Sequence, residues 1–274
     1  KALSLFASDT VLNSGSKMGD VNPDDLAGGL MQCVRALRDA FYDTARGRVN
    51  YDGIRSSSEY ESYQRLANRL REFDLQRLVG RRNKLAFWVN LYNTIVVHGI
   101  IFENVTQSVQ EAPGIFSRLK YQIGDHRFSA DDIEHGILRG NARPWFHIMH
   151  QWMPGDPRKA WMIQPVDPRI HFALVCGSRS CAPIDYYDAE AIYEQLEIAS
   201  RSFVNSSEVI VLPEEEKVLL SEIFKWYAAD FGGIQGVTDF LYDYLADDKG
   251  RKCLQEKAGR LRFEYIYYDW NLNR

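Results

Sequence analysis

The residues best suited to covalent chemistry lie in the segment His171-Phe-Ala-Leu-Val-Cys-Gly-Ser-Arg-Ser-Cys181. A thiol beside a glycine/serine loop can be exposed, and the backbone N–H groups of residues 177–181 can stabilise an oxyanion. Arg179 adds a positive charge nearby, which favours the thiolate over the thiol. We therefore predict that Cys176 is a nucleophile.

A cysteine nucleophile needs a base, and we predict that His98 takes this role. His98 belongs to a long apolar segment, residues 84–102, that also carries two amides, Asn90 and Asn93. In thiol–histidine enzymes a third side chain orients the imidazole, and either amide can do so here. The sequence thus predicts a site in which the amides and imidazole of one segment meet the thiol of another.

Glu134 is the alternative group for orienting His98. It lies in the segment 131–139, which begins with helix-capping residues, and it shares a helix face with Ile137 and Leu138. That face points inward, and a buried carboxylate is either paired with a cation or used in acid–base chemistry. We include Glu134 among the candidate site residues.

Two other interpretations of the thiol remain open. In the first, Cys176 is a small buried side chain, and the amides form a structural network within a non-catalytic interaction or regulatory module. In the second, Cys176 and Cys181 form a redox pair or bind a metal together with His147, His150 or His171. Their spacing matches neither C-x-x-C nor a standard zinc pair, so we predict no metal and no cofactor.

The element that must position these groups is the segment 84–102. It is apolar on nearly every side, which is typical of a helix buried on all faces. Its polar residues fall within roughly 140° of arc on a helix wheel. A buried amide without a partner costs roughly 1–3 kcal/mol, so this edge must meet polar groups inside the protein. The amides and the histidine also argue against a membrane span.

The remaining chain predicts an α+β fold with more helix than strand. A small, mainly antiparallel sheet packs against the buried central helix, loosely like papain or transglutaminase. Residues 1–21 form an extended lead-in. Helices are expected at 22–46, 58–73, 83–102, 131–139, 189–205, 222–231, 235–246 and 248–258, and strands at 121–123, 126–128, 169–176, 208–212, 217–220 and 261–268. Since a strand alternates its faces, His171 and Cys176 point apart, which argues against His171 as the base unless the strand is bulged.

We expect one compact domain overall, with an N-terminal helical region, residues 1–79, packed on a core formed by residues 80–274. The 274 residues are 45% hydrophobic and 26% charged, as in ordinary globular proteins. A net charge of -4 argues against nucleic-acid binding. The chain begins at Lys1 rather than Met, so neighbouring domains can precede it. We expect a cytoplasmic location.

Four stretches of the sequence resemble the family called domain of unknown function 547. They are Phe87-Trp-Val-Asn-Leu-Tyr-Asn93, Phe128-Ser-Ala-Asp-Asp-Ile-Glu-His-Gly-Ile-Leu-Arg139, His171-Phe-Ala-Leu-Val-Cys-Gly-Ser-Arg-Ser-Cys-Ala-Pro183 and Tyr268-Asp-Trp-Asn-Leu-Asn273. The resemblance implies a shared architecture over about residues 80–273 and no established activity. The family pattern places its amides on Asn90 and Asn93, its acid on Glu134 and its thiol on Cys176.

The sequence therefore favours a thiol-dependent hydrolase or acyl transferase acting on a small-molecule or peptide ligand. Cys176 is the nucleophile, His98 the base, and Asn90, Asn93 or Glu134 the orienting group. The alternative is the non-catalytic module described above. Thiol accessibility distinguishes the two, because a purely structural cysteine resists thiol reagents in the folded protein.

Overall fold

A computed structural model describes residues 9–15 and 26–274 of the chain. The predicted helix start at Asn22 lies outside the described residues, as does most of the predicted lead-in. Within the lead-in, Thr10–Val11 form the short strand β1, which pairs in parallel with a strand from the middle of the chain.

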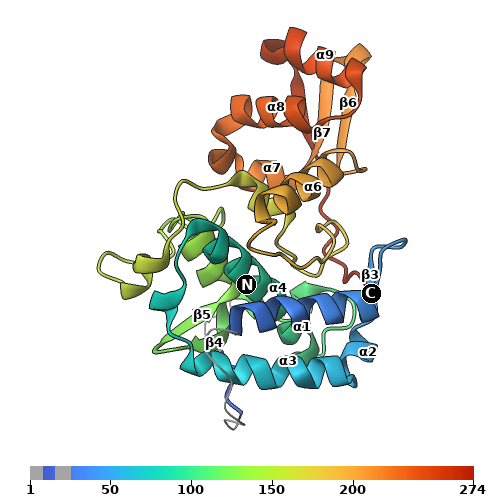
Figure 1. Ribbon diagram of the computed structural model, residues 1–274. Coiled ribbons are helices and arrows are strands. Elements are labelled where there is room, and N and C mark those ends of the chain that lie inside the picture. Colours follow the sequence, from blue (N-terminus) through green and yellow to red (C-terminus); the bar gives the residue numbers. More distant parts are fainter. Residues whose placement is uncertain (1–8, 16–25) are drawn as a thin grey trace.

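The central helix α4, Arg81–Phe102, organises the larger part of the molecule (Figure 1). Every residue from Leu85 to Ile101 is buried, which confirms the prediction of a helix enclosed on all faces. The helix is long and apolar enough to cross a membrane, but 94% of its most apolar stretch is buried within the protein. Its length and hydrophobicity are therefore accounted for by packing inside the core.

The N-terminal helices pack around α4. They are α1 (Leu26–Phe41), α2 (Tyr51–Arg55) and α3 (Ser58–Arg69), and a short hairpin, β2 (Tyr42–Asp43) with β3 (Arg48–Val49), joins α1 to α2. Their buried side chains belong to the same hydrophobic cluster as those of α4. The N-terminal region is thus part of the main core.

A second group of elements covers the other side of this core. It contains the short helix α5 (Ile115–Arg118), the strands β4 (Leu119–Ile123) and β5 (His126–Ser129), and a π-helix, Asp132–Leu138. The strands β4 and β5 form the predicted antiparallel hairpin, and β1 adds to its edge. π-Helical turns are rare and often occur at functional sites.

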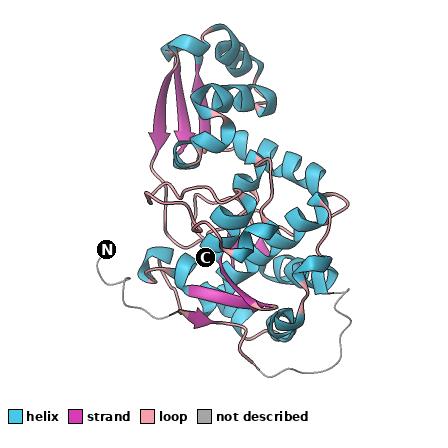
Figure 2. Cartoon of the chain, turned by 90° about the vertical axis from the view of Figure 1, so that its left-hand side faces the viewer, coloured by secondary structure: helices cyan, strands magenta, loops and turns pink. Residues whose placement is uncertain are grey.

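The C-terminal part forms a second lobe with its own hydrophobic cluster (Figures 1 and 2). It contains α6 (Ile192–Val204), β6 (Val209–Leu212), β7 (Lys217–Ser221), α7 (Glu222–Trp226), α8 (Gly233–Tyr244), α9 (Asp248–Glu256) and β8 (Arg262–Ile266). The strand β7 pairs antiparallel with β6 and parallel with β8. The chain then returns to the larger lobe, where Leu272 bridges to Ser178.

The predicted α+β class is confirmed, but the strands are distributed differently from the prediction. Among the described residues they form two three-stranded sheets and one two-stranded hairpin instead of one small sheet. Each three-stranded sheet combines one antiparallel and one parallel pairing. The two parallel pairings are made by β1 and β8, each of which adds to the edge of an antiparallel hairpin.

The prediction of a strand at residues 169–176 is wrong. Residues Pro168–Phe172 form a 3₁₀ helix, and the following residues to Cys176 are irregular. The Asp167 side chain accepts a hydrogen bond from the Arg169 N–H, and Pro168 occupies the first turn. These are helix-start signals, and they prevail over the apolar run that follows. The strand-parity argument against His171 therefore does not hold.

Candidate active site

The thiol of Cys176 lies at a sharp turn and is only half-buried. Gly177 has φ of +81°, and a Cβ there would lie 2.4 Å from Ile100 Cδ1, so glycine is required beside the thiol. The Cys176 Sγ lies 3.0 Å from Ser178 Oγ and 3.2 Å from Tyr268 Oη. All four cysteines are free thiols. The predicted thiol-bearing turn is therefore present, and it is held by a tyrosine from the far end of the chain.

Neutral hydrogen-bond donors favour the ionised form of this thiol. The pKa of Cys176 falls to about 7, because the hydrogen bond with the Cys181 side chain outweighs burial, and the Ser178 and Tyr268 hydroxyls add to the effect. The pKa of Cys181 rises well above its usual value, so Cys181 keeps its proton. Its Sγ accepts from the Cys176 N–H at 3.0 Å and donates to the Leu174 carbonyl at 3.4 Å. Arg179, the predicted positive charge, has a 53% exposed side chain and pairs with Asp269. Hydrogen bonds to Cys176, and not the positive charge of Arg179 that the sequence predicted, therefore lower the pKa of this thiol.

Most backbone N–H groups of the thiol loop, residues 177–181, already donate to carbonyls of the protein. The N–H groups of Arg179, Ser180 and Cys181 donate to the carbonyls of Asn271, Asp269 and Ser178. In the described part of the chain, the N–H of Gly177 is left without a carbonyl or side-chain acceptor. The predicted oxyanion site across residues 177–181 therefore reduces to the N–H groups that directly follow Cys176.

The structure does not bring His98 to the thiol. His98 Nδ1 lies 2.6 Å from Tyr121 Oη, and its ring packs edge-on against Tyr60, Tyr63 and Tyr121. Burial lowers the pKa of His98 to about 4, so the imidazole is neutral at pH 7. None of these partners is shared with Cys176. The assignment of His98 as the base is therefore corrected: it is a core histidine that satisfies a buried tyrosine.

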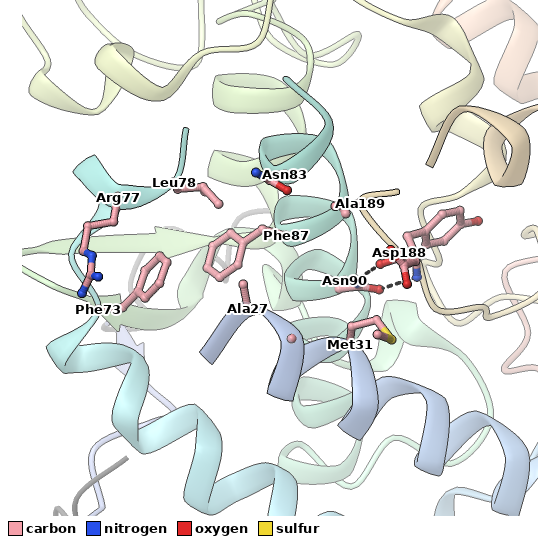
Figure 3. A pocket seen from close by; sticks show the side chains of 13 residues that line it. Ala27, Met31, Phe73, Arg77, Leu78, Asn83, Phe87, Asn90, Asp188 and Ala189 are labelled. Carbon is pink, nitrogen blue, oxygen red and sulfur yellow. Dashed lines mark hydrogen bonds between the residues drawn. The ribbon is translucent and has the colours of Figure 1, made fainter. Parts of the chain in front are cut away.

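Asn90 and Asn93 hold two loop segments against α4. Asn93 Nδ2 donates to Ala173 O at 3.0 Å, and its Oδ1 accepts from Val175 N at 2.9 Å. Asn90 bonds Tyr187 in the same two-sided way, at 2.7 and 2.9 Å, beside a cavity of about 300 Å³ (Figure 3). In each amide, both the nitrogen and the oxygen bond a backbone group. The prediction that this edge meets the thiol segment is correct, but the amides position its backbone and orient no imidazole.

Glu134 lies in a second polar cluster, on the π-helix. Its Oε1 accepts a 2.6 Å hydrogen bond from the Tyr227 hydroxyl. Burial opposes ionisation, but His135, this hydrogen bond and Arg139 together hold the pKa of Glu134 below its usual value. Glu134 is therefore a buried carboxylate, as the sequence predicted.

The cluster continues through residues that the sequence had not connected. Asp230 pairs with Arg139 and with His171, whose Nε2 lies 2.9 Å from the carboxylate. The His171 ring stacks on Tyr227 with centroids 3.9 Å apart. Asp230 and Tyr227 come from the second lobe. Asp230 lies 59 positions after His171 and 91 after Arg139, and Tyr227 lies 93 after Glu134, so no local pattern marks them as partners.

Two tyrosines, Tyr92 and Tyr227, are influenced electrostatically by both Glu134 and Cys176. Burial raises the pKa of both well above the usual range, and the nearby charges of Glu134 and Cys176 raise it further. Both hydroxyls therefore stay protonated near neutral pH. Glu134 and Cys176 therefore act electrostatically on the same two tyrosines.

Within the residues that the structure describes, His, Cys, Asp and Glu form no group of three or more that could hold a metal ion. His171, one of the histidines considered for a metal, bonds Asp230, and His150 Nδ1 lies 2.8 Å from Asn141 O. These side chains are engaged within the protein.

Comparison with known proteins gives one match. Residues 75–204 match the family model described as "Protein of unknown function, DUF547". This segment resembles the DUF547 family. The DUF547 match contains α4, the π-helix and the thiol loop, and it ends before Tyr227, Asp230 and Tyr268. No curated protein and no solved structure matches the chain.

Proposed function

We propose that this protein is a thiol-dependent hydrolase or acyl transferase with Cys176 as its nucleophile. The observation that carries the proposal is the set of donors around Cys176 Sγ, which brings its pKa to about 7. About half of such a thiol is ionised at neutral pH, so it can attack without an imidazole to remove its proton. Partial exposure of Cys176 supports access by a substrate.

The surroundings of the thiol favour an activated acyl group, such as a thioester, as substrate. His98 packs elsewhere, and the pKa of the Tyr268 hydroxyl is too high for an efficient general acid. An amine needs an acid to leave, whereas a thiolate leaves unaided. In the proposed reaction, the Cys176 thiolate bonds to the acyl carbon and expels the substrate thiolate. Water or an amine then attacks the acyl carbon, the bond to Cys176 Sγ breaks to regenerate the thiolate, and the proton of the attacking water or amine passes to solvent.

The test is hydrolysis of a small aryl thioester by the full chain. We expect turnover and an acylated Cys176 detectable by mass spectrometry, both lost in Cys176→Ala. Cys253→Ala, which changes a buried thiol of the second lobe, is the matched control and should retain turnover. Equal rates with and without Cys176, across several acyl donors, would eliminate the proposal.

A non-catalytic role is the second candidate, and the amides favour it. Asn90 and Asn93 bond only backbone groups, as they would in a purely structural network. This alternative predicts that Cys176 resists thiol reagents and shows no acylation. The thioester assay therefore separates the two candidates directly.

A further inference from the structure

A cavity of about 270 Å³ is lined by residues of the β2–β3 hairpin and of the thiol loop. The hairpin lies beside the C-terminus of the chain (Figure 1). Three arginines line it: Arg46 and Arg48 from the hairpin, and Arg179 from the loop. None of its lining residues is acidic. The cavity therefore gathers positive charge from two segments that are far apart in the sequence.

The arginines are weakly neutralised. Arg46 lies 3.5 Å from Asp43, and Arg179 lies 3.9 Å from Asp269, both with guanidinium groups more than half exposed. Among the residues that the structure describes, Arg48 has no carboxylate within ion-pair distance. Exposed pairs of this kind contribute little energy, so an anion can displace or supplement them. The cavity is thus open to a negatively charged ligand.

The amide side chain of Asn273 is a further polar group at this cavity. Asn273 lines the cavity and is only 5% exposed. Its Oδ1 accepts a 2.7 Å hydrogen bond from Tyr51, whereas its Nδ2 has no acceptor within the described residues. The Nδ2 group is therefore a hydrogen-bond donor that an acceptor bound in the cavity can use. Tyr42 also lines the cavity.

We propose that this cavity binds the phosphate group of a small molecule. The three arginines that line the cavity offer forks of N–H donors, which suit a tetrahedral oxyanion with several acceptor oxygens better than a carboxylate. The volume of about 270 Å³ is just below the roughly 300–1,000 Å³ of small-molecule sites, which suits a ligand as small as a phosphate group. Cys181 forms part of the wall, and the site holds whether or not Cys176 is a nucleophile.

The test is calorimetric titration of the full chain with inorganic phosphate at constant ionic strength. We expect saturable binding that weakens at least tenfold in Arg48→Ala and in Arg179→Ala. Arg65→Ala, an exposed arginine on α3, is the control and should bind as the unchanged protein does. Because all three arginines are on the surface, these variants should fold.

Two further titrations test whether the site prefers phosphate and whether phosphate binding is independent of the Cys176 thiol. Acetate should bind at least tenfold more weakly than phosphate, and equal affinity would overturn the phosphate assignment. Cys176→Ser should bind phosphate normally even where thioester turnover is lost. No saturable phosphate binding, or the same affinity in the Arg48 and Arg179 variants, would overturn the proposal itself.

Discussion

Replacing Asn93 by Ala should destabilise the protein more than most single changes do. Asn93 is fully buried, and it is the hydrogen-bond partner of the Ala173 carbonyl and the Val175 N–H. Each backbone group left buried without a partner costs about 1–3 kcal/mol. The two together cost about 2–6 kcal/mol, a large part of the roughly 5–15 kcal/mol that stabilises a typical domain.

The measurement is urea unfolding of Asn93→Ala and Asn83→Ala, with the free energy of unfolding extrapolated to water. Asn83 is the control, because its amide bonds Val79 O at the exposed start of the same helix. We expect a loss below about 1 kcal/mol there. A loss below about 1 kcal/mol for Asn93→Ala would refute the conclusion that Asn93 holds the thiol segment against α4.

An isosteric change sharpens this test. In Asn93→Asp, a carboxylate oxygen still accepts from Val175 N–H but faces the Ala173 carbonyl, to which it cannot donate. We expect this variant to be at least as unstable as Asn93→Ala at pH 7. Equal stability of Asn93→Asp and the unchanged protein would show that the donor half of the contact carries no energy.

Three other predictions concern pH and backbone geometry. The pKa of His98 is about 4 in the folded state against 6.5 for an ordinary histidine, so stability should be complete above pH 6.5 and fall as the pH drops towards 4. In His98→Gln the urea-unfolding free energy should vary less over this range, and an unchanged slope would contradict the assignment. Burial, with Glu134 and Asp132 nearby, raises the pKa of Asp131 from 3.8 to about 8, so its contribution is present below pH 3.8 and lost as the pH rises to 8. Asp131→Asn should therefore stabilise the protein at pH 8 more than at pH 4. The control is Asp125→Asn, at the exposed β4–β5 turn, which should not show this difference. An equal effect of Asp131→Asn at both pH values would count against the burial of Asp131 as the cause. Gly177→Ala should lower the thermal midpoint far more than Gly155→Ala, because both have positive φ but only Gly177 lacks space for a Cβ. Similar midpoints for the two glycine variants would show that the Ile100 contact is unimportant.

The sequence was sufficient to predict α4 and its need for polar partners. A helix that is apolar on nearly every side is buried in the protein, and its amides then need hydrogen-bond partners there. It could not identify those partners. Asn90 bonds a residue 97 positions away, and Asn93 bonds residues 80 and 82 positions away. Such contacts depend on how the later segments fold back, which no local pattern determines.

The error over His98 was avoidable from helix geometry. Asn93 and His98 are five residues apart, which places their side chains about 140° apart around the helix axis. Both therefore cannot face one loop, and the structure turns His98 towards Tyr121 and Asn93 towards Ala173. The polar residues of α4 serve two different faces of the core.

The apolar run at 169–176 was misassigned for a different reason. A short run of buried residues fits a strand or a helical turn equally well. The preceding Asp167-Pro168 pair was the signal that distinguished them. Tyr268, by contrast, lay in a motif that had been noted, but its place beside Cys176 depends on the return of the chain after β8.

The most direct test of the account is the pH dependence of Cys176 alkylation by iodoacetamide in the native protein, mapped by mass spectrometry. The account predicts a midpoint near pH 7 for Cys176 and a clearly higher midpoint in Tyr268→Phe, because one donor to the thiolate is removed. Cys33, whose pKa is raised by burial, should react only at higher pH. A Cys176 midpoint at or above that of Cys33, or no response to the loss of the Tyr268 hydroxyl, would contradict the central claim.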